Sequence, residues 1–160
     1  MEEVFNAVKT VFTHRIRLSP FDVEKRINIV TDGANSSGVG FVLFQNADDL
    51  KQGENVSIVK ANSSGLRDCQ KQYYAMDTEV LALKFACDAS FYYLYGAPLI
   101  HVYTDCISLE GIFHKPLGDI KNRRIRDMVE KLMGFTFEFH YVPAEKNEIA
   151  DCFSRLTQEI

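Results

Sequence analysis

The chain has few cysteines, no long apolar run and no excess of positive charge. Even its uncharged stretch over residues 91–104 is shorter than the roughly 18 apolar residues that a membrane span needs, and it contains Pro98 and His101. We therefore expect no transmembrane helix. Hydrophobic residues make up 46% of the 160 positions and charged residues 25%, which excludes a disordered chain, a collagen-like chain and a disulfide scaffold. One globular domain fits this length.

The cysteines indicate a reducing compartment. Cys69, Cys87, Cys106 and Cys152 are widely spaced and form no CxxC pair, which favours reduced, mostly buried thiols. The first residues, Met1-Glu2-Glu3, lack the basic region of a secretory signal. We expect an intracellular, cytoplasmic protein.

The charge balance argues against binding of nucleic acid through the overall electrostatic attraction of the protein for phosphates. There are 18 basic and 22 acidic residues, a formal net charge of −4. A protein that grips phosphates through its own surface is usually basic. If this chain handles nucleic acid, cations must lie between its acidic groups and the phosphates.

The periodicity of apolar residues predicts a mixed α/β order. Residues 1–20 form an N-terminal helix and linker, which fits either the tail of an upstream domain or a capping helix, and residues 21–160 form the main domain. Strands are expected at 27–31, 39–44, 56–60, 99–104 and 135–141. Helices are expected from Asp77 or Thr78 to Leu94, at 107–113, at 119–133 and at the C-terminal end. This order predicts a five-stranded mixed sheet with helices on both faces.

Four acids stand where such a fold could bring them together. Asp32 and Asp105 each follow a Thr at the end of a strand, Glu79 lies in the first turn of the long helix, and Asp151 lies on the last helix. If the strands at 27–31 and 99–104 are parallel neighbours, their carboxyl ends form one crevice. Clustered carboxylates need cations, and hard oxygen ligands suit Mg²⁺ or Mn²⁺. Two such ions would support in-line attack at phosphorus.

Each acid also has an ordinary explanation when it is taken alone. An Asp at a strand end is commonly a turn former or a helix cap, a Glu in a first turn is favoured by the helix dipole, and an Asp on a helix is commonly solvated. Asp77 and Asp88 compete with Glu79 on the same helix. Asp88 is nine positions beyond Glu79 and cannot reach the same site, whereas Asp77 fits a capping role.

Six motifs in order resemble one family. They are IVTDGA (29–34), GVGFVL (38–43), TEVLAL (78–83), FYYLYG (91–96), VYTD (102–105) and KNEIADCFSRL (146–156). Together they are similar to the ribonuclease H domain of reverse transcriptases from gypsy-type LTR retrotransposons. The resemblance covers roughly residues 21–156, and residues 5–20 resemble the end of the preceding connection segment.

The resemblance implies an RNase H-like fold and Mg²⁺-dependent hydrolysis of the RNA strand in an RNA–DNA hybrid during reverse transcription. By position, Asp32 would bridge two metal ions, for which Mn²⁺ could substitute. Glu79 and Asp105 would bind the ion on the leaving-group side, and Asp151 the ion that activates water. It further implies a covalently linked polymerase domain and a virus-like particle. Cellular ribonucleases H carry a His where this chain has Tyr141, and we expect the adjacent His140 to be an ordinary surface histidine rather than a catalytic one.

Contacts with the substrate are predicted in two places. Asn35 and Ser36 follow Asp32 and could contact 2′-hydroxyl groups, although a plain hairpin turn explains them nearly as well. A basic cluster could contact phosphates, or could be a solvated helix face. It consists of Lys115, Lys121, Arg123, Arg124 and Arg126, of which we select Lys121, Arg123 and Arg124.

Two other functions remain open at this stage. The same fold could serve as a non-catalytic module for dimer or polymerase contacts, in which case Mg²⁺ would not change its thermal stability. It could also be an integrase or resolvase, although the Glu at the head of the long helix argues against those classes.

Overall fold

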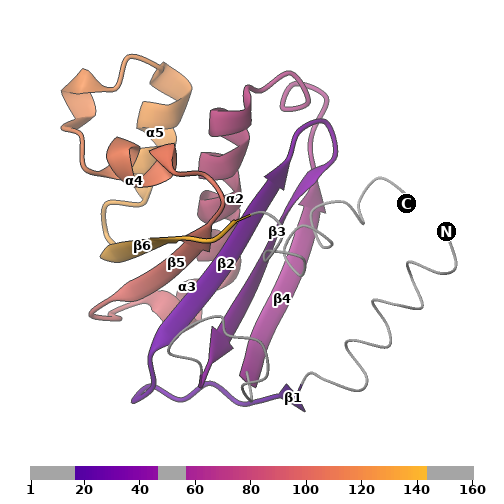
Figure 1. Ribbon diagram of the computed structural model, residues 1–160, viewed down its shortest axis with the longest axis vertical. Coiled ribbons are helices and arrows are strands. Elements are labelled where there is room, and N and C mark those ends of the chain that lie inside the picture. Colours follow the sequence, from indigo (N-terminus) through magenta and orange to yellow (C-terminus); the bar gives the residue numbers. More distant parts are fainter. Residues whose placement is uncertain (1–16, 47–56, 144–160) are drawn as a thin grey trace, which may run out of the picture.

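The computed structural model describes residues 17–46 and 57–143. In these residues a mixed sheet runs in the order β1-β4-β3-β2-β5-β6 (Figure 1). The strands are β1 (Arg17–Leu18), β2 (Ile27–Ala34), β3 (Gly38–Gln45), β4 (Ser57–Gly65), β5 (Ile100–Thr104) and β6 (Phe137–Tyr141). All five predicted strands are present, and the two-residue β1 extends the sheet beside β4.

The pairing of the strands confirms the predicted topology. β2 and β3 form an antiparallel hairpin, and β4 continues it antiparallel to β3. β2 is also the parallel neighbour of β5, and β6 is parallel to β5 at the sheet edge. The strand order therefore reverses between β2 and β5, which are central strands of the sheet. Because these two strands are parallel, their carboxyl ends lie at the same end of the sheet.

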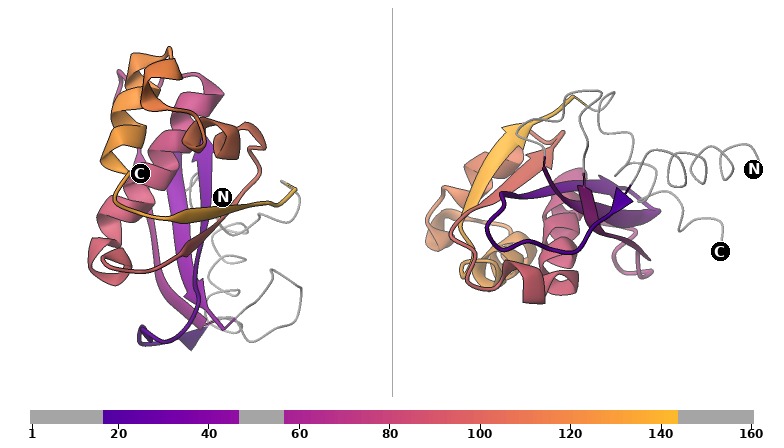
Figure 2. Two further views of the ribbon diagram at one scale, coloured as in Figure 1. Left: turned by 90° about the vertical axis from the view of Figure 1, so that its left-hand side faces the viewer. Right: turned by 90° about the horizontal axis from the view of Figure 1, so that it is seen from below.

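The described helices pack against one face of the sheet (Figure 2). They are α2 (Ala75–Ala89), α3 (Phe91–Leu94), α4 (Ser108–Phe113), the 3-10 helix η1 (Leu117–Asp119) and α5 (Arg123–Lys131). The single helix predicted up to Leu94 is divided at Ser90 into α2 and α3. The helix predicted at 119–133 is shorter, because the Asn122 side chain caps α5 by accepting hydrogen bonds from the Arg124 and Ile125 amides.

The main core lies between the sheet and the helices α2 and α5, which cover one of its faces. Ile29, Phe41, Leu83 and Val102 are fully buried in it. Alternation along the strands places a second buried cluster, which includes Val30, Val42, Phe44 and Tyr103, on the opposite face. The prediction of helices on both faces is thus confirmed for one face. The N-terminal and final helices, and most of the polar turn after β3, lie outside the described residues.

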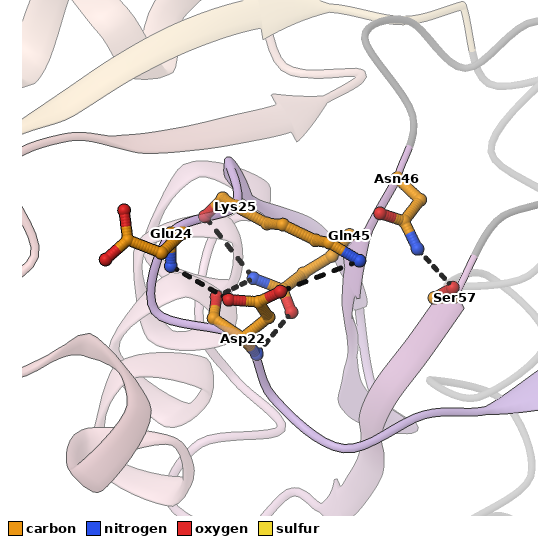
Figure 3. A network of polar contacts seen from close by, with 6 residues as sticks. All are labelled: Asp22, Glu24, Lys25, Gln45, Asn46 and Ser57. Carbon is orange, nitrogen blue, oxygen red and sulfur yellow. Dashed lines mark hydrogen bonds and ion pairs between the residues drawn. The ribbon is translucent and has the colours of Figure 1, made fainter.

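A buried amide fixes the loop that leads into β2 (Figure 3). Gln45 at the end of β3 accepts a hydrogen bond from the Asp22 amide at 3.0 Å and donates to the Asp22 carbonyl at 2.8 Å. The same side chain donates to the Lys25 carbonyl at 3.4 Å. The bonds satisfy backbone groups of Asp22 and Lys25 that have no partner in the sheet. They therefore hold the loop before β2 against the end of β3. Within the described residues, no helix has the length and apolar character to cross a bilayer.

Candidate active site

Two of the four predicted acids lie near the carboxyl ends of neighbouring parallel strands: β2 continues two residues beyond Asp32, further than predicted, and Asp105 directly follows β5. Val30 of β2 pairs with Tyr103 of β5, and Asp32 and Asp105 each follow two residues later. Because the two strands are parallel and in register, both acids lie at the carboxyl-terminal end of the central strands. Asp32 is only 7% exposed, and Asp105 is half-buried.

Glu79 approaches the same end of the sheet from α2, and a glycine makes the approach possible. A Cβ atom at Gly33 would lie 2.8 Å from the Thr78 carbonyl oxygen and 2.9 Å from the Thr78 Cγ2. The backbone of β2 therefore meets the first turn of α2 directly, one residue from Asp32 on the strand and one from Glu79 on the helix. The Gly33 backbone also hydrogen-bonds the Glu79 carboxylate.

We call Asp32, Glu79 and Asp105 the carboxylate cluster. One oxygen from each side chain can be chosen so that all three lie within 4.8 Å of one another. Burial raises the pKa of Glu79 to about 8, and the charges of Asp105 and then Asp32 add to the effect. Three carboxylates from three separate elements thus share one small, poorly solvated volume.

The carboxylate cluster has the donor set of a divalent cation site. Glu79 Oε2 is buried and has no hydrogen-bond partner among the described residues. A buried acceptor without a donor is costly, and a hard cation would satisfy it. All the donors are oxygen atoms, which suits Mg²⁺ or Mn²⁺ better than softer metals. The residues present therefore fit such an ion.

The fourth predicted acid, Asp151, lies outside the described residues, and its place in the site stays a prediction. Asn35 and Ser36 lie in the β2–β3 turn, just beyond the Asp32 end of β2, and both are exposed. Ser36 has a φ of 68° and Ser37 N–H bonds the Ala34 carbonyl at 3.1 Å, so the hairpin turn is established. Their contact with substrate stays a prediction.

The basic residues differ in what their side chains do. Lys121 and Arg123 are exposed. The Arg124 Nη1 bonds Asp77 Oδ2 at 2.7 Å, and its guanidinium lies 3.9 Å from the centre of the Tyr73 ring. Asn122 Nδ2 donates to the other Asp77 oxygen at 2.9 Å. Asp77 is therefore a buried residue of the first turn of α2 that joins α2 to α5 through these two contacts. The sequence-based prediction that Asp77 caps the helix is wrong, since Tyr74 is the N-cap residue.

His140 is not a member of the carboxylate cluster. Its Nε2 lies 2.9 Å from Nδ1 of His101 on the neighbouring strand β5, and Tyr141 is exposed at the end of β6. The His140 ring is partly exposed and stacks on Tyr103, and the expectation that it is an ordinary surface histidine rather than a catalytic one stays a prediction. Sequence reasoning also missed the role of Gly33, although the Asp-Gly pair at a strand end was a signal for it.

Gly33→Ala should damage both the fold and the site. The new methyl group would force β2 and α2 apart, which we expect to cost about 1–3 kcal/mol of unfolding free energy. A displacement of about 1 Å between Asp32 and Glu79 should lower any activity of the site about 100-fold. Urea unfolding and initial rates would measure the two effects. Gly111→Ala is the matched control, since nothing lies within 4 Å of a Cβ there, and it should leave both quantities nearly unchanged.

Arg124→Ala should destabilise the protein, whatever its effect on substrate. It leaves the buried Asp77 carboxylate without its charged donor, at a cost of about 2 kcal/mol. Arg123→Ala removes only an exposed ion pair with Asp127, 3.8 Å long, and should cost less than about 0.5 kcal/mol. Chemical unfolding of both variants provides the comparison. Equal stabilities would show that the Arg124–Asp77 pair contributes nothing.

Comparison with known proteins agrees with the fold. The chain is 28% identical over 156 residues to the "Retrovirus-related Pol polyprotein from transposon opus" of Drosophila melanogaster, covering 98% of this chain and 15% of that protein. It is 32% identical over 143 residues to the "Transposon Tf2-3 polyprotein" of Schizosaccharomyces pombe, covering 89% of this chain and 10% of that protein. The chain thus spans only a small part of these curated relatives.

The fold is that of ribonucleases H. The crystal structure of LC11-RNase H1 in complex with RNA/DNA hybrid superposes with a TM-score of 0.58 at 18% identity, over 82% of this chain and 96% of that one. A family model described as "RNase H-like domain found in reverse transcriptase" matches residues 22–135. The chain belongs to this family of reverse-transcriptase RNase H-like domains.

Proposed function

We propose that the domain is a Mg²⁺-dependent endoribonuclease that hydrolyses the RNA strand of RNA–DNA hybrids. The observation that carries the proposal is the carboxylate cluster, in which Asp32, Glu79 and Asp105 converge from β2, α2 and the end of β5. The likeness in fold to LC11-RNase H1, which was crystallised with an RNA/DNA hybrid, supports this class of substrate.

Asp32, Glu79 and Asp105 would hold the metal, with Asp151 as the proposed fourth ligand. When two Mg²⁺ or Mn²⁺ ions are bound, they supply an activated water and stabilise the charge that develops at phosphorus. The chain's own contribution is rigid placement of negative charge. Two of the carboxylates extend from paired strands and the third from a buried helix, so little reorganisation is needed when cations and phosphate arrive.

Recognition of the hybrid would come from side chains around that end of the sheet. Asn35 and Ser36 can offer an amide and a hydroxyl to the 2′-hydroxyl groups that distinguish RNA from DNA. Lys121 and Arg123, both exposed, can contact phosphates without regard to sequence. The Arg124 side chain is about half exposed, and its Nη1 is bonded to Asp77, so only its other guanidinium nitrogens would contact phosphates.

The relatives that support a setting for the domain are transposon polyproteins, of which this chain covers a small part. We propose that it comes from a gypsy-type LTR retrotransposon, that residues 1–20 end a connection segment, and that residues 21–160 are the nuclease domain joined to a polymerase. Its place of action would be intracellular, in the cytoplasm or a virus-like particle. A linked polymerase would supply the affinity for nucleic acid that this chain, with a net charge of −4, does not provide.

The test is a comparison of substrates. The purified protein is incubated with labelled RNA–DNA hybrid, duplex RNA and duplex DNA, with Mg²⁺, with Mn²⁺, and with a chelator. We expect cleavage of the RNA strand of the hybrid alone, and only with metal. Binding of the hybrid without cleavage under all metal conditions would contradict the proposal and favour a non-catalytic module that serves dimer or polymerase contacts.

A further inference from the structure

A second group of possible metal ligands lies on the neighbouring strands β5 and β6. His101 comes from β5, and Glu138 and His140 come from β6. In the parallel pairing of these strands, His101 is opposite Glu138 and Tyr103 is opposite His140. Phe137 and Phe139 pack into the helical core, so alternation places Glu138 and His140 on the opposite face of the sheet.

The three side chains present donor atoms at the spacing of a tetrahedral metal site. His101 Nδ1 lies 2.9 Å from His140 Nε2 and 3.8 Å from Glu138 Oε1, and His140 Nε2 lies 3.4 Å from the same oxygen. Zinc binds such atoms at about 2.0–2.2 Å, so two ligands at the tetrahedral angle are about 3.4 Å apart. The three observed separations bracket that value.

The two imidazole rings are already held in place. The His140 ring stacks on Tyr103 with 4.8 Å between centroids, and its plane lies 25° from that of the His101 ring. The Tyr103 hydroxyl in turn accepts a hydrogen bond from Arg26 at 3.1 Å.

The charges around the group are consistent with a cation. Glu138 supplies one negative charge and is half-exposed, which leaves a route for the ion. Arg26 opposes a cation, but its Nε and Nη2 donate to Asn28 and Tyr103, which holds the guanidinium in its own network. Two imidazoles and one carboxylate are a ligand set typical of zinc, with a fourth position left for water.

We propose that His101, Glu138 and His140 form a zinc site, distinct in chemistry from the all-oxygen carboxylate cluster. Zinc bound there would join the edge strand β6 to β5 through two imidazoles and a carboxylate. Its role would be to fasten β6, a five-residue edge strand that has only one neighbour in the described sheet. The alternative is a simple hydrogen bond between two neutral imidazoles, and the experiment below separates the two.

The test is a titration of the zinc-free chain with zinc chloride, against a competing chelator that prefers zinc to magnesium and in a reducing buffer. Asp32→Asn and saturating Mg²⁺ are used throughout, so that the carboxylate cluster does not contribute. We expect one zinc per chain. His101→Gln and His140→Gln should weaken binding at least about 100-fold, and Glu138→Gln about 10-fold. His114→Gln, at an exposed position after α4, should leave binding unchanged.

Two further readouts guard against variants that fold poorly. Glu138 is exposed enough that its replacement by Gln should leave the fold intact, which circular dichroism checks. In the parent protein, zinc should slow hydrogen exchange of the β6 amides, and cobalt should give the visible spectrum of a tetrahedral nitrogen and oxygen site. Absence of zinc binding, or zinc binding that survives both His101→Gln and His140→Gln, would overturn the proposal.

Discussion

Asp32→Asn should lower the rate of hybrid cleavage on the order of 10³-fold or more, because it removes a central metal-binding charge while keeping the size of the side chain. The variant should remain folded. Asp32 is buried and its charge raises the pKa of Glu79, so its removal relieves repulsion in the carboxylate cluster. Initial rates at saturating Mg²⁺ and the melting temperature of the metal-free protein would measure the two effects.

Asp88→Asn is the matched control for this substitution. Asp88 lies near the end of α2, is exposed, and pairs with Lys84 on its own helix. Its replacement should leave cleavage within about twofold, since a surface ion pair of this kind contributes little. Asp32→Asn with full activity would place the reaction elsewhere in the molecule.

Glu79 should make the metal-free protein less stable as the pH rises. Its pKa is raised from an ordinary value of 4.5 to about 8, so the folded state keeps a proton that the unfolded state has lost. Stability therefore falls between about pH 4.5 and pH 8, by up to about 1.4 kcal/mol per pH unit and about 3 kcal/mol in all by pH 7. Bound Mg²⁺ should remove much of this dependence, because it stabilises the ionised carboxylate.

Glu79→Gln should abolish that pH dependence and be more stable than the parent protein at pH 7–8. Urea unfolding in chelator at several values between pH 5 and pH 8 would measure it. Glu110→Gln, an exposed residue of α4, serves as the control and should follow the parent curve. Parallel curves for the parent protein and Glu79→Gln would show that Glu79 is ionised in the folded state throughout this range.

The sequence predicted the part of the site that depends on local patterns. β-branched runs that end in Thr-Asp located Asp32 and Asp105 near strand ends, and the condition that their two strands be parallel neighbours is met by the pairing of β2 with β5. The apolar spacing predicted Glu79 in the first turn of the long helix, whereas α2 begins at Ala75 and Glu79 lies in its second turn. Each of these inferences needs only a few neighbouring residues and a general rule of topology.

The rest depends on contacts between distant segments. The close approach of Gly33 to Thr78 and the ion pair of Asp77 with Arg124 join positions about 45 residues apart. His101 and His140 meet only because β6 pairs with β5 in one register. The start of α5 was missed for a local reason, since Asn122 caps the helix within a polar stretch that gives no periodic signal.

The most direct test of the account is a crystal structure of the chain soaked in Mn²⁺, with the metal located by its anomalous scattering. The account predicts a peak among the carboxylates of Asp32, Glu79 and Asp105, within coordination distance of all three, and no such peak in Asp32→Asn. Manganese that binds only elsewhere, or carboxylates that point away from one another in the soaked crystal, would contradict it.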